Sequence, residues 1–197
     1  MDKTTITGVI LAGGLGRRMG GVDKGLQLLN GKALVRHVAE RLAPQVGSLA
    51  INANRSIADY AALGYPVLAD ELPDFAGPLA GLHAALGAAA TPLVLTAPCD
   101  SPYLPLDLAG RLHDALVAVG AELAIARADG RLHPVFCLCR TTLRDPLAAY
   151  LVGGGRRVAQ WCADQGAVIV DFDDQPRAFD NFNTLQDLAD KPTRSST

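Results

Sequence analysis

The sequence lacks any apolar run long enough to cross a bilayer. Its most apolar region, residues 84–97, is interrupted by Pro92 and is too short for a membrane span. The first residues, MDKTTITG, contain neither the apolar core nor the cleavage site of a secretory signal peptide. We therefore expect a cytoplasmic protein without a membrane partner.

Charge is also scarce and nearly balanced. The 197 residues include 18 Lys and Arg and 20 Asp and Glu, which gives a formal net charge of −2. Nucleic-acid-binding domains are commonly basic, so this balance argues against a nucleic-acid partner. With 49% hydrophobic and 19% charged residues, the composition excludes disorder and predicts a well-buried α/β protein.

Cysteine is infrequent, and its spacing excludes two common uses. The four cysteines stand at positions 99, 137, 139 and 162. This spacing fits neither a zinc site nor a C-x-x-C redox pair. We expect buried, unpaired thiols.

A glycine-rich loop follows the first predicted strand, residues 6–11. Five glycines fall within positions 13–21: Gly13, Gly14, Gly16, Gly20 and Gly21. Glycine permits positive φ and lets a ligand approach backbone N–H groups closely. Arg17, Arg18 and Lys24 add three cations to this loop, and cations of both kinds bind phosphate oxygens. The segment predicts a polyphosphate site; the alternative is a glycine-rich connection with solvated arginines.

The loop matches neither of two familiar phosphate-binding patterns. A Walker A loop needs Ser or Thr after its lysine, whereas Gly25 follows Lys24. A dinucleotide fingerprint that starts at Gly14 needs glycine where Met19 stands, and Asn52 replaces the acid expected after the next strand. The loop therefore indicates a third kind of nucleotide site.

Strand and helix patterns alternate along the chain. Such β-α repeats predict an open, mostly parallel, doubly wound (Rossmann-like) sheet with helices on both faces. The predicted strands are 6–11, 48–53, 67–68, 93–97, 123–127, 135–139 and 167–172, with 135–139 a candidate for the antiparallel direction. The predicted helices are 34–42, 57–63, one from position 78, 108–119, 142–151 and 156–165. We expect one domain over residues 1–190 and a disordered tail at 191–197.

Polar or flexible residues follow several of these predicted strands. Gly13, Asn52, Asp70 and Asp100 each stand at or just after the end of an apolar run. In doubly wound sheets, ligands bind beyond the carboxyl ends of the strands. We expect these residues to converge on one site.

The residue types suggest a role for each position. Asp100, framed by Pro98 and Pro102, suits Mg²⁺, which one or two carboxylates hold together with substrate phosphates. Asp70 can accept hydrogen bonds from the N–H edge of guanine or from a ribose, and Asn52 offers a donor and an acceptor to a base. The structural alternatives are that both aspartates cap turns and that Asn52 ends a strand.

The ordered segments resemble the signature of one family. These segments are LAGG at 11–14, RMGG at 18–21, DK at 23–24, NAN at 52–54, Asp70, GPLAG at 77–81, PCD at 98–100 and N-x-NT at 181–184. The pattern is similar to that of the molybdenum-cofactor guanylyltransferases of the MobA type, which belong to the nucleotidyltransferases. The resemblance runs from about residue 6 to residue 188, and the short spacing between Arg18 and Lys24 is among its more specific features.

The resemblance implies an activity and its substrates. Members of this family transfer GMP from GTP to the terminal phosphate of molybdenum-molybdopterin, releasing pyrophosphate and forming a guanine dinucleotide cofactor. It implies Mg²⁺ as the cofactor. It also implies contacts with other proteins of molybdenum cofactor biosynthesis and with acceptor molybdoenzymes.

The resemblance also assigns residues to roles. The GTP-binding residues would be Leu11, Ala12, Gly13, Lys24, Asn52, Asp70 and Asp100, and the catalytic residues Arg18, Lys24 and Asp100. Asp100 would bind Mg²⁺, and Asn181 and Asn183 would form the acceptor side. Because these asparagines are two apart in an extended segment, they should face the same way. Their structural alternative is to pin the last loop to the sheet.

Three other functions stay open at this point. A cytidylyltransferase for the same pterin would differ only in base choice. A sugar-phosphate nucleotidyltransferase commonly has a longer loop between the arginine and the lysine. A non-catalytic GTP-binding module would need neither Asp100 with its two prolines nor the Asn181 and Asn183 pair.

Overall fold

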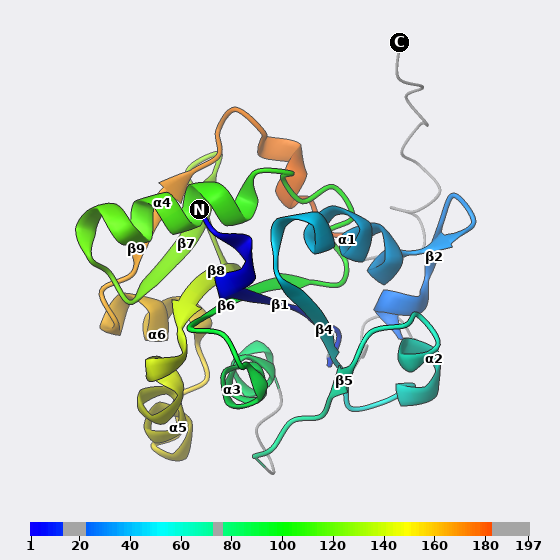
Figure 1. Ribbon diagram of the computed structural model, residues 1–197, viewed down its shortest axis with the longest axis horizontal. Helices are drawn as coiled ribbons and strands as arrows, with labels where there is room; N and C mark the ends of the chain where they lie inside the picture. Colours follow the sequence, from blue (N-terminus) through cyan, green and yellow to red (C-terminus); the bar gives the residue numbers. More distant parts are fainter. Residues whose placement is uncertain (14–22, 73–76, 183–197) are drawn as a thin grey trace.

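The structure is a computed structural model that describes residues 1–13, 23–72 and 77–182 (Figure 1). Arg18, Asn183 and the predicted tail at 191–197 lie outside the described residues.

Within that part of the chain, the main sheet has seven strands in the order β5-β4-β1-β6-β8-β7-β9. The strands are β1 (Ile6–Leu11), β4 (Ser48–Asn52), β5 (Val67–Leu68), β6 (Leu93–Pro98), β7 (Leu123–Ala128), β8 (Arg131–Arg140) and β9 (Val168–Asp171). Strand β8 is antiparallel to β6 and to β7, and the other neighbours are parallel. The mostly parallel sheet and the antiparallel direction of 135–139 are confirmed.

Apolar residues on both faces of the strands explain why the sheet is central. In β1, Ile6 and Ile10 belong to the core on one face and Val9 to the core on the other, and all three are fully buried. Strand β6 repeats the pattern with Leu95 and Val94. A parallel strand covered on both faces reads as a continuous apolar run, which is how these segments appear in the sequence.

Helices cover both faces of the sheet, as predicted (Figure 1). Helices α1 (Leu34–Leu42) and α4 (Leu108–Val119) pack on one face. Helices α3 (Pro78–Ala88), α5 (Arg144–Val152) and α6 (Val158–Asp164) pack on the other. The short helix α2 (Ile57–Ala61) lies beside β5. Short 3₁₀ helices are η1 (Lys3–Thr5), η3 (Lys24–Leu26), η4 (Ala43–Gln45), η5 (Thr141–Leu143) and η6 (Pro176–Phe179).

The structure contains two tight hairpin turns that were not among the predicted elements. A small hairpin, β2 (Leu28–Leu29) with β3 (Lys32–Ala33), precedes α1 and turns at Asn30 and Gly31, both at positive φ. Asp129 and Gly130, also at positive φ, join β7 to β8, so β8 begins at Arg131. Asn-Gly and Asp-Gly are the preferred pairs for such turns, so the sequence carried the signal for both.

Two predictions from composition can be compared with the structure. All four cysteines are buried and unpaired, as expected from their spacing. Among the helices that the structure describes, none is long and apolar enough to cross a membrane.

Candidate nucleotide-binding site

The carboxyl ends of four parallel strands meet in register at one edge of the sheet. Leu11, the last residue of β1, pairs with Asn52 of β4 on one side and with Pro98 of β6 on the other, and Asn52 pairs with Leu68 of β5. Backbone hydrogen bonds extend this alignment past the strands, from Ala12 N to Asn52 O at 2.8 Å. The residues that follow these strands therefore lie along one edge, as the sequence predicted.

Lys24 and Asp100 form an ion pair at this edge. The distance from Lys24 Nζ to Asp100 Oδ2 is 2.7 Å, although the residues are 76 positions apart in the chain. Asp100 is only 8% exposed, and its backbone carbonyl accepts a hydrogen bond from Phe182 N at 3.0 Å. The pair places a fixed carboxylate and an ammonium side by side, which suits a site for a polyphosphate and its cation.

Tyr60 of α2 holds the segment that carries Lys24. The Tyr60 hydroxyl donates a hydrogen bond to Asp23 Oδ1, and burial raises the pKa of Tyr60, so the hydroxyl stays protonated. Gly25 lies against the same hydroxyl, where a Cβ atom would come within 2.5 Å of Tyr60 Oη. Tyr60 was not among the predicted site residues, because a tyrosine in a short helix carries no signal of such a contact.

Two asparagines orient the Asp70 carboxylate. Asn52 Nδ2 donates to Asp70 Oδ1 at 2.9 Å and Asn54 Nδ2 donates to Asp70 Oδ2 at 2.7 Å. Asp70 N in turn donates to Asn54 Oδ1 at 2.8 Å. Each carboxylate oxygen can accept a further hydrogen bond, so Asp70 is fixed and can still bind a donor pair. Asn54 was not among the predicted site residues, although its spacing of two from Asn52 places both side chains on one face.

Glycines allow the backbone to close over these asparagines. A Cβ atom at Gly81 of α3 would lie 2.2 Å from Asn52 Oδ1 and 3.0 Å from Leu11 Cδ2. A Cβ atom at Gly13 would lie 3.2 Å from Asn54 Nδ2. Helix α3 and the start of the glycine-rich loop therefore approach Asn52 and Asn54 closely.

Asn181 joins the segment after β6. Its Oδ1 accepts a hydrogen bond from the buried Ser101 hydroxyl at 2.7 Å, and its own side chain lies in an exposed position. The next residue, Phe182, is hydrogen-bonded to the Asp100 carbonyl, so Asn181 lies close to Asp100 as well as to Ser101. Its predicted companion, Asn183, and the loop residue Arg18 are not among the described residues.

Among the residues that the structure describes, no group of three His, Cys, Asp or Glu side chains is placed to hold a metal ion. Substrate phosphate oxygens are the usual partners of a single carboxylate at a Mg²⁺ site.

The Lys24–Asp100 ion pair and the oriented Asp70 carboxylate lie beyond the carboxyl ends of parallel strands, the place where α/β proteins of this architecture commonly bind nucleotides. The family model of the MobA-like NTP transferase domain matches residues 8–168. The chain belongs to the MobA-like NTP transferase family.

Relatives agree with this assignment over nearly the whole chain. A molybdenum cofactor guanylyltransferase from Cupriavidus necator is 54% identical over 197 residues, which cover 98% of each chain. One from Bordetella pertussis is 52% identical over 192 residues, covering 95% of this chain and 97% of its own.

Solved structures share the fold. The crystal structure of molybdopterin-guanine dinucleotide biosynthesis protein A from Archaeoglobus fulgidus superposes with a TM-score of 0.76 at 25% identity, covering 93% of this chain and 95% of its own. A 4-diphosphocytidyl-2C-methyl-D-erythritol synthase from Anaerococcus prevotii has a TM-score of 0.70 at 13% identity, covering 95% and 96%, and so supports the fold alone.

Proposed function

We propose that the chain transfers GMP from GTP to molybdenum-molybdopterin. A phosphate oxygen of the acceptor attacks the α-phosphorus of GTP and forms a new P–O bond. The bond from the α-phosphorus to the oxygen bridging the α- and β-phosphates breaks, and pyrophosphate leaves with the electron pair. The observation that carries this proposal is the convergence of the Lys24–Asp100 pair and the Asn52–Asp70–Asn54 network at one sheet edge.

Asp70 would select guanine. Its two oxygens, held by the amides of Asn52 and Asn54, can accept hydrogen bonds from the N1–H and N2–H₂ groups of guanine. Cytosine would present one donor, its N4 amino group, beside the acceptors N3 and O2, so one Asp70 oxygen would face an acceptor and lose its hydrogen bond. In this arrangement Asn52 acts through Asp70, and Leu11, Ala12 and Gly13 line the site.

Lys24 would neutralise the triphosphate, together with Arg18 from the loop. The residues present fit a Mg²⁺ ion, because the nearly buried Asp100 carboxylate offers one oxygen ligand beside the place where the phosphates would lie. Bound Mg²⁺ would supply charge neutralisation at the phosphate oxygens. The attacking phosphate is already an anion, so the reaction needs no strong general base, and positioning provides most of the acceleration.

We expect the Asp70→Asn variant to lose its preference for GTP. The new amide presents a donor to the guanine N–H groups, so kcat/KM for GTP should fall about ten- to a hundredfold, the equivalent of roughly 1–3 kcal/mol. The measurement is Mg²⁺-dependent pyrophosphate release in the presence of molybdopterin, with GTP, ATP, CTP and UTP compared. Guanine selection would be refuted if the wild-type protein used all four nucleotides equally well or used CTP faster than GTP.

Asn181 and Asn183 would contact the acceptor. We expect Asn181→Ala to lower transfer to molybdopterin by about tenfold while the GTP dissociation constant changes less than about twofold, because the amide serves only the second substrate. Transfer kinetics and calorimetry with GTP measure the two effects.

Ser101→Ala is the control for this variant. It removes the same hydrogen bond as Asn181→Ala but keeps the Asn181 amide, so it should transfer faster than Asn181→Ala. If GTP affinity, thermal stability and transfer decline together in Asn181→Ala, the residue is structural.

A further inference from the structure

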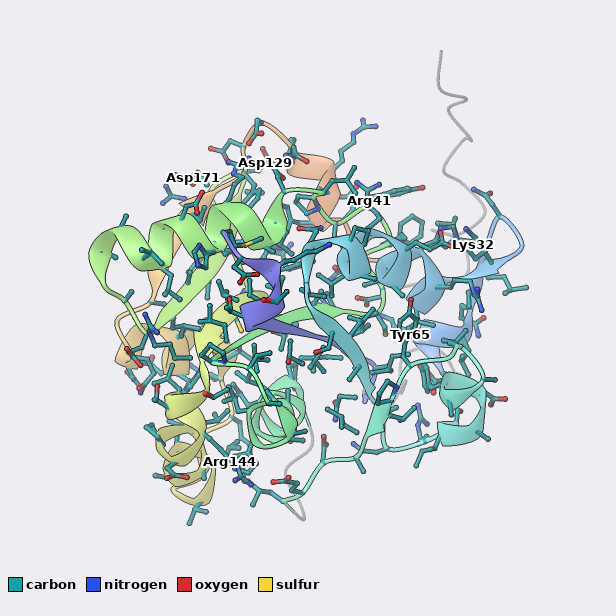
Figure 2. All side chains as sticks on the ribbon, in the orientation of Figure 1. Lys32, Arg41, Tyr65, Asp129, Arg144 and Asp171 are labelled. Carbon is teal, nitrogen blue, oxygen red and sulfur yellow. The ribbon has the colours of Figure 1, made fainter. Side chains whose placement is uncertain are left out.

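A charged cluster lies directly beside the Asp70 network. Glu71 follows Asp70, and its Oε2 accepts a hydrogen bond from Arg144 Nη2 of α5 at 2.9 Å. His83 of α3 places its Nδ1 3.6 Å from the same Glu71 oxygen. Figure 2 shows Arg144 beside α3, between that helix and α5. Residues from α3 and from the distant α5 thus meet at Glu71, the residue next to Asp70.

A glycine makes room for the arginine on α3. A Cβ atom at Gly87 would lie 2.9 Å from Arg144 Nε and 3.0 Å from its Cζ. The guanidinium therefore lies against the helix where a side chain is missing, and this position lets it reach Glu71.

The cluster also holds buried polar atoms without partners. Among the described residues, His83 Nδ1 and Arg144 Nε are buried and make no hydrogen bond, and His83 is only 5% exposed. Burial lowers the pKa of His83, while the Glu71 carboxylate acts in the opposite direction, so the ring is neutral near pH 7. Arg144 then supplies the positive charge that faces Glu71. Unpaired buried polar atoms cost stability, so a role beyond packing would account for them.

We propose that the Arg144–Glu71 pair, packed against His83, forms a clasp that positions Asp70 and thereby sets the preference for guanine. Asp70 and Glu71 share a peptide bond, so fixing the Glu71 side chain limits the movement of Asp70. Helix α3 carries His83, which lies beside Glu71, and Gly81 of the same helix lies against Asn52. Asn52 and the segment that carries Asp70 are therefore both placed by α3. These are positioning residues, and the inference rests on the proposed function.

The test compares binding of GTP with binding of inosine triphosphate, which lacks the 2-amino group of guanine. Arg144→Met removes the charge, and Gly87→Ala displaces the guanidinium without changing any charge. We expect the preference for GTP over inosine triphosphate to fall about three- to tenfold in both variants, within the range for coupled neighbours. Calorimetry measures both dissociation constants, and kcat at saturating GTP should stay within about twofold of wild type, because the reacting groups are unchanged. Arg144→Lys, which keeps the charge, should retain most of the preference.

Two control variants match these substitutions. Gly110→Ala changes a helical glycine of α4 whose Cβ would meet nothing within 4 Å. Arg140→Met removes an arginine paired with Glu122 at 3.2 Å and of similar exposure. Both should keep the wild-type preference. If Arg144→Met and Gly87→Ala keep the wild-type preference for GTP over inosine triphosphate, the clasp is overturned while the guanine contact at Asp70 stands. A wild-type protein that binds both nucleotides equally would overturn the guanine contact at Asp70, and the clasp with it.

Discussion

Replacing Asp100 by alanine is expected to lower guanylyl transfer by at least about a hundredfold, the loss typical for one electrostatic stabiliser of a transition state. In the proposed site Asp100 would be the carboxylate ligand of Mg²⁺, and its 2.7 Å ion pair fixes the position of Lys24. The substitution would remove the proposed metal ligand and also the ion-pair partner of Lys24. Pyrophosphate release at a fixed Mg²⁺ concentration measures the effect.

The fold should survive this substitution. Asp100 stands at a strand end and outside the apolar core, and the Lys24 ammonium is partly exposed and can be hydrated after the substitution, so we expect the unfolding free energy to fall by only about 1–3 kcal/mol. Asp107→Ala, at the exposed start of α4, is the matched control and should keep full activity. Wild-type turnover in Asp100→Ala would place the metal elsewhere.

Gly81→Ala is expected to weaken GTP binding by about ten- to a hundredfold, which corresponds to disturbing one buried hydrogen-bond network. The new Cβ would come 2.2 Å from Asn52 Oδ1, so the Asn52 side chain must move. Asn52 is 2% exposed and has little space to move, and its displacement releases the Asp70 carboxylate from the amide that orients it.

The same substitution should favour the helix while it weakens GTP binding, so stability and affinity can be distinguished. Alanine in place of a helical glycine favours the helix by up to about 1 kcal/mol. Gly110→Ala in α4 receives that gain without a clash, so it should be more stable than wild type and bind GTP normally. Calorimetry and thermal unfolding of both variants separate the two effects. Normal GTP affinity in Gly81→Ala would show that Asn52 does not orient the base-binding carboxylate.

Much of this arrangement could be predicted because it depends on local patterns. The segment 34–42 has apolar residues at helical spacing and Pro44 after it, and α1 has these bounds in the structure. The convergence of Asn52 and Asp100 on one edge follows from the parallel direction of the strands that precede them.

Contacts between distant segments could not be predicted in this way. Nothing in the sequence around Lys24 specifies its contact with Asp100, and the pairing of Arg144 with Glu71 depends on how α5 packs against α3. The β2–β3 hairpin was missed for another reason. Asn30 and Gly31 signal its turn, but its strands are only two residues each and show no alternation.

The identity of the reaction product distinguishes guanylyl transfer from GTP hydrolysis and from cytidylyl transfer. The protein is incubated with GTP, Mg²⁺ and molybdenum-molybdopterin, and the pterin product is analysed by mass spectrometry while pyrophosphate is quantified. Guanylyl transfer yields a pterin whose mass has increased by one GMP unit, with one pyrophosphate released for each product formed. Release of inorganic phosphate and GDP without a dinucleotide, or a CMP unit on the pterin when CTP is also present, would contradict it.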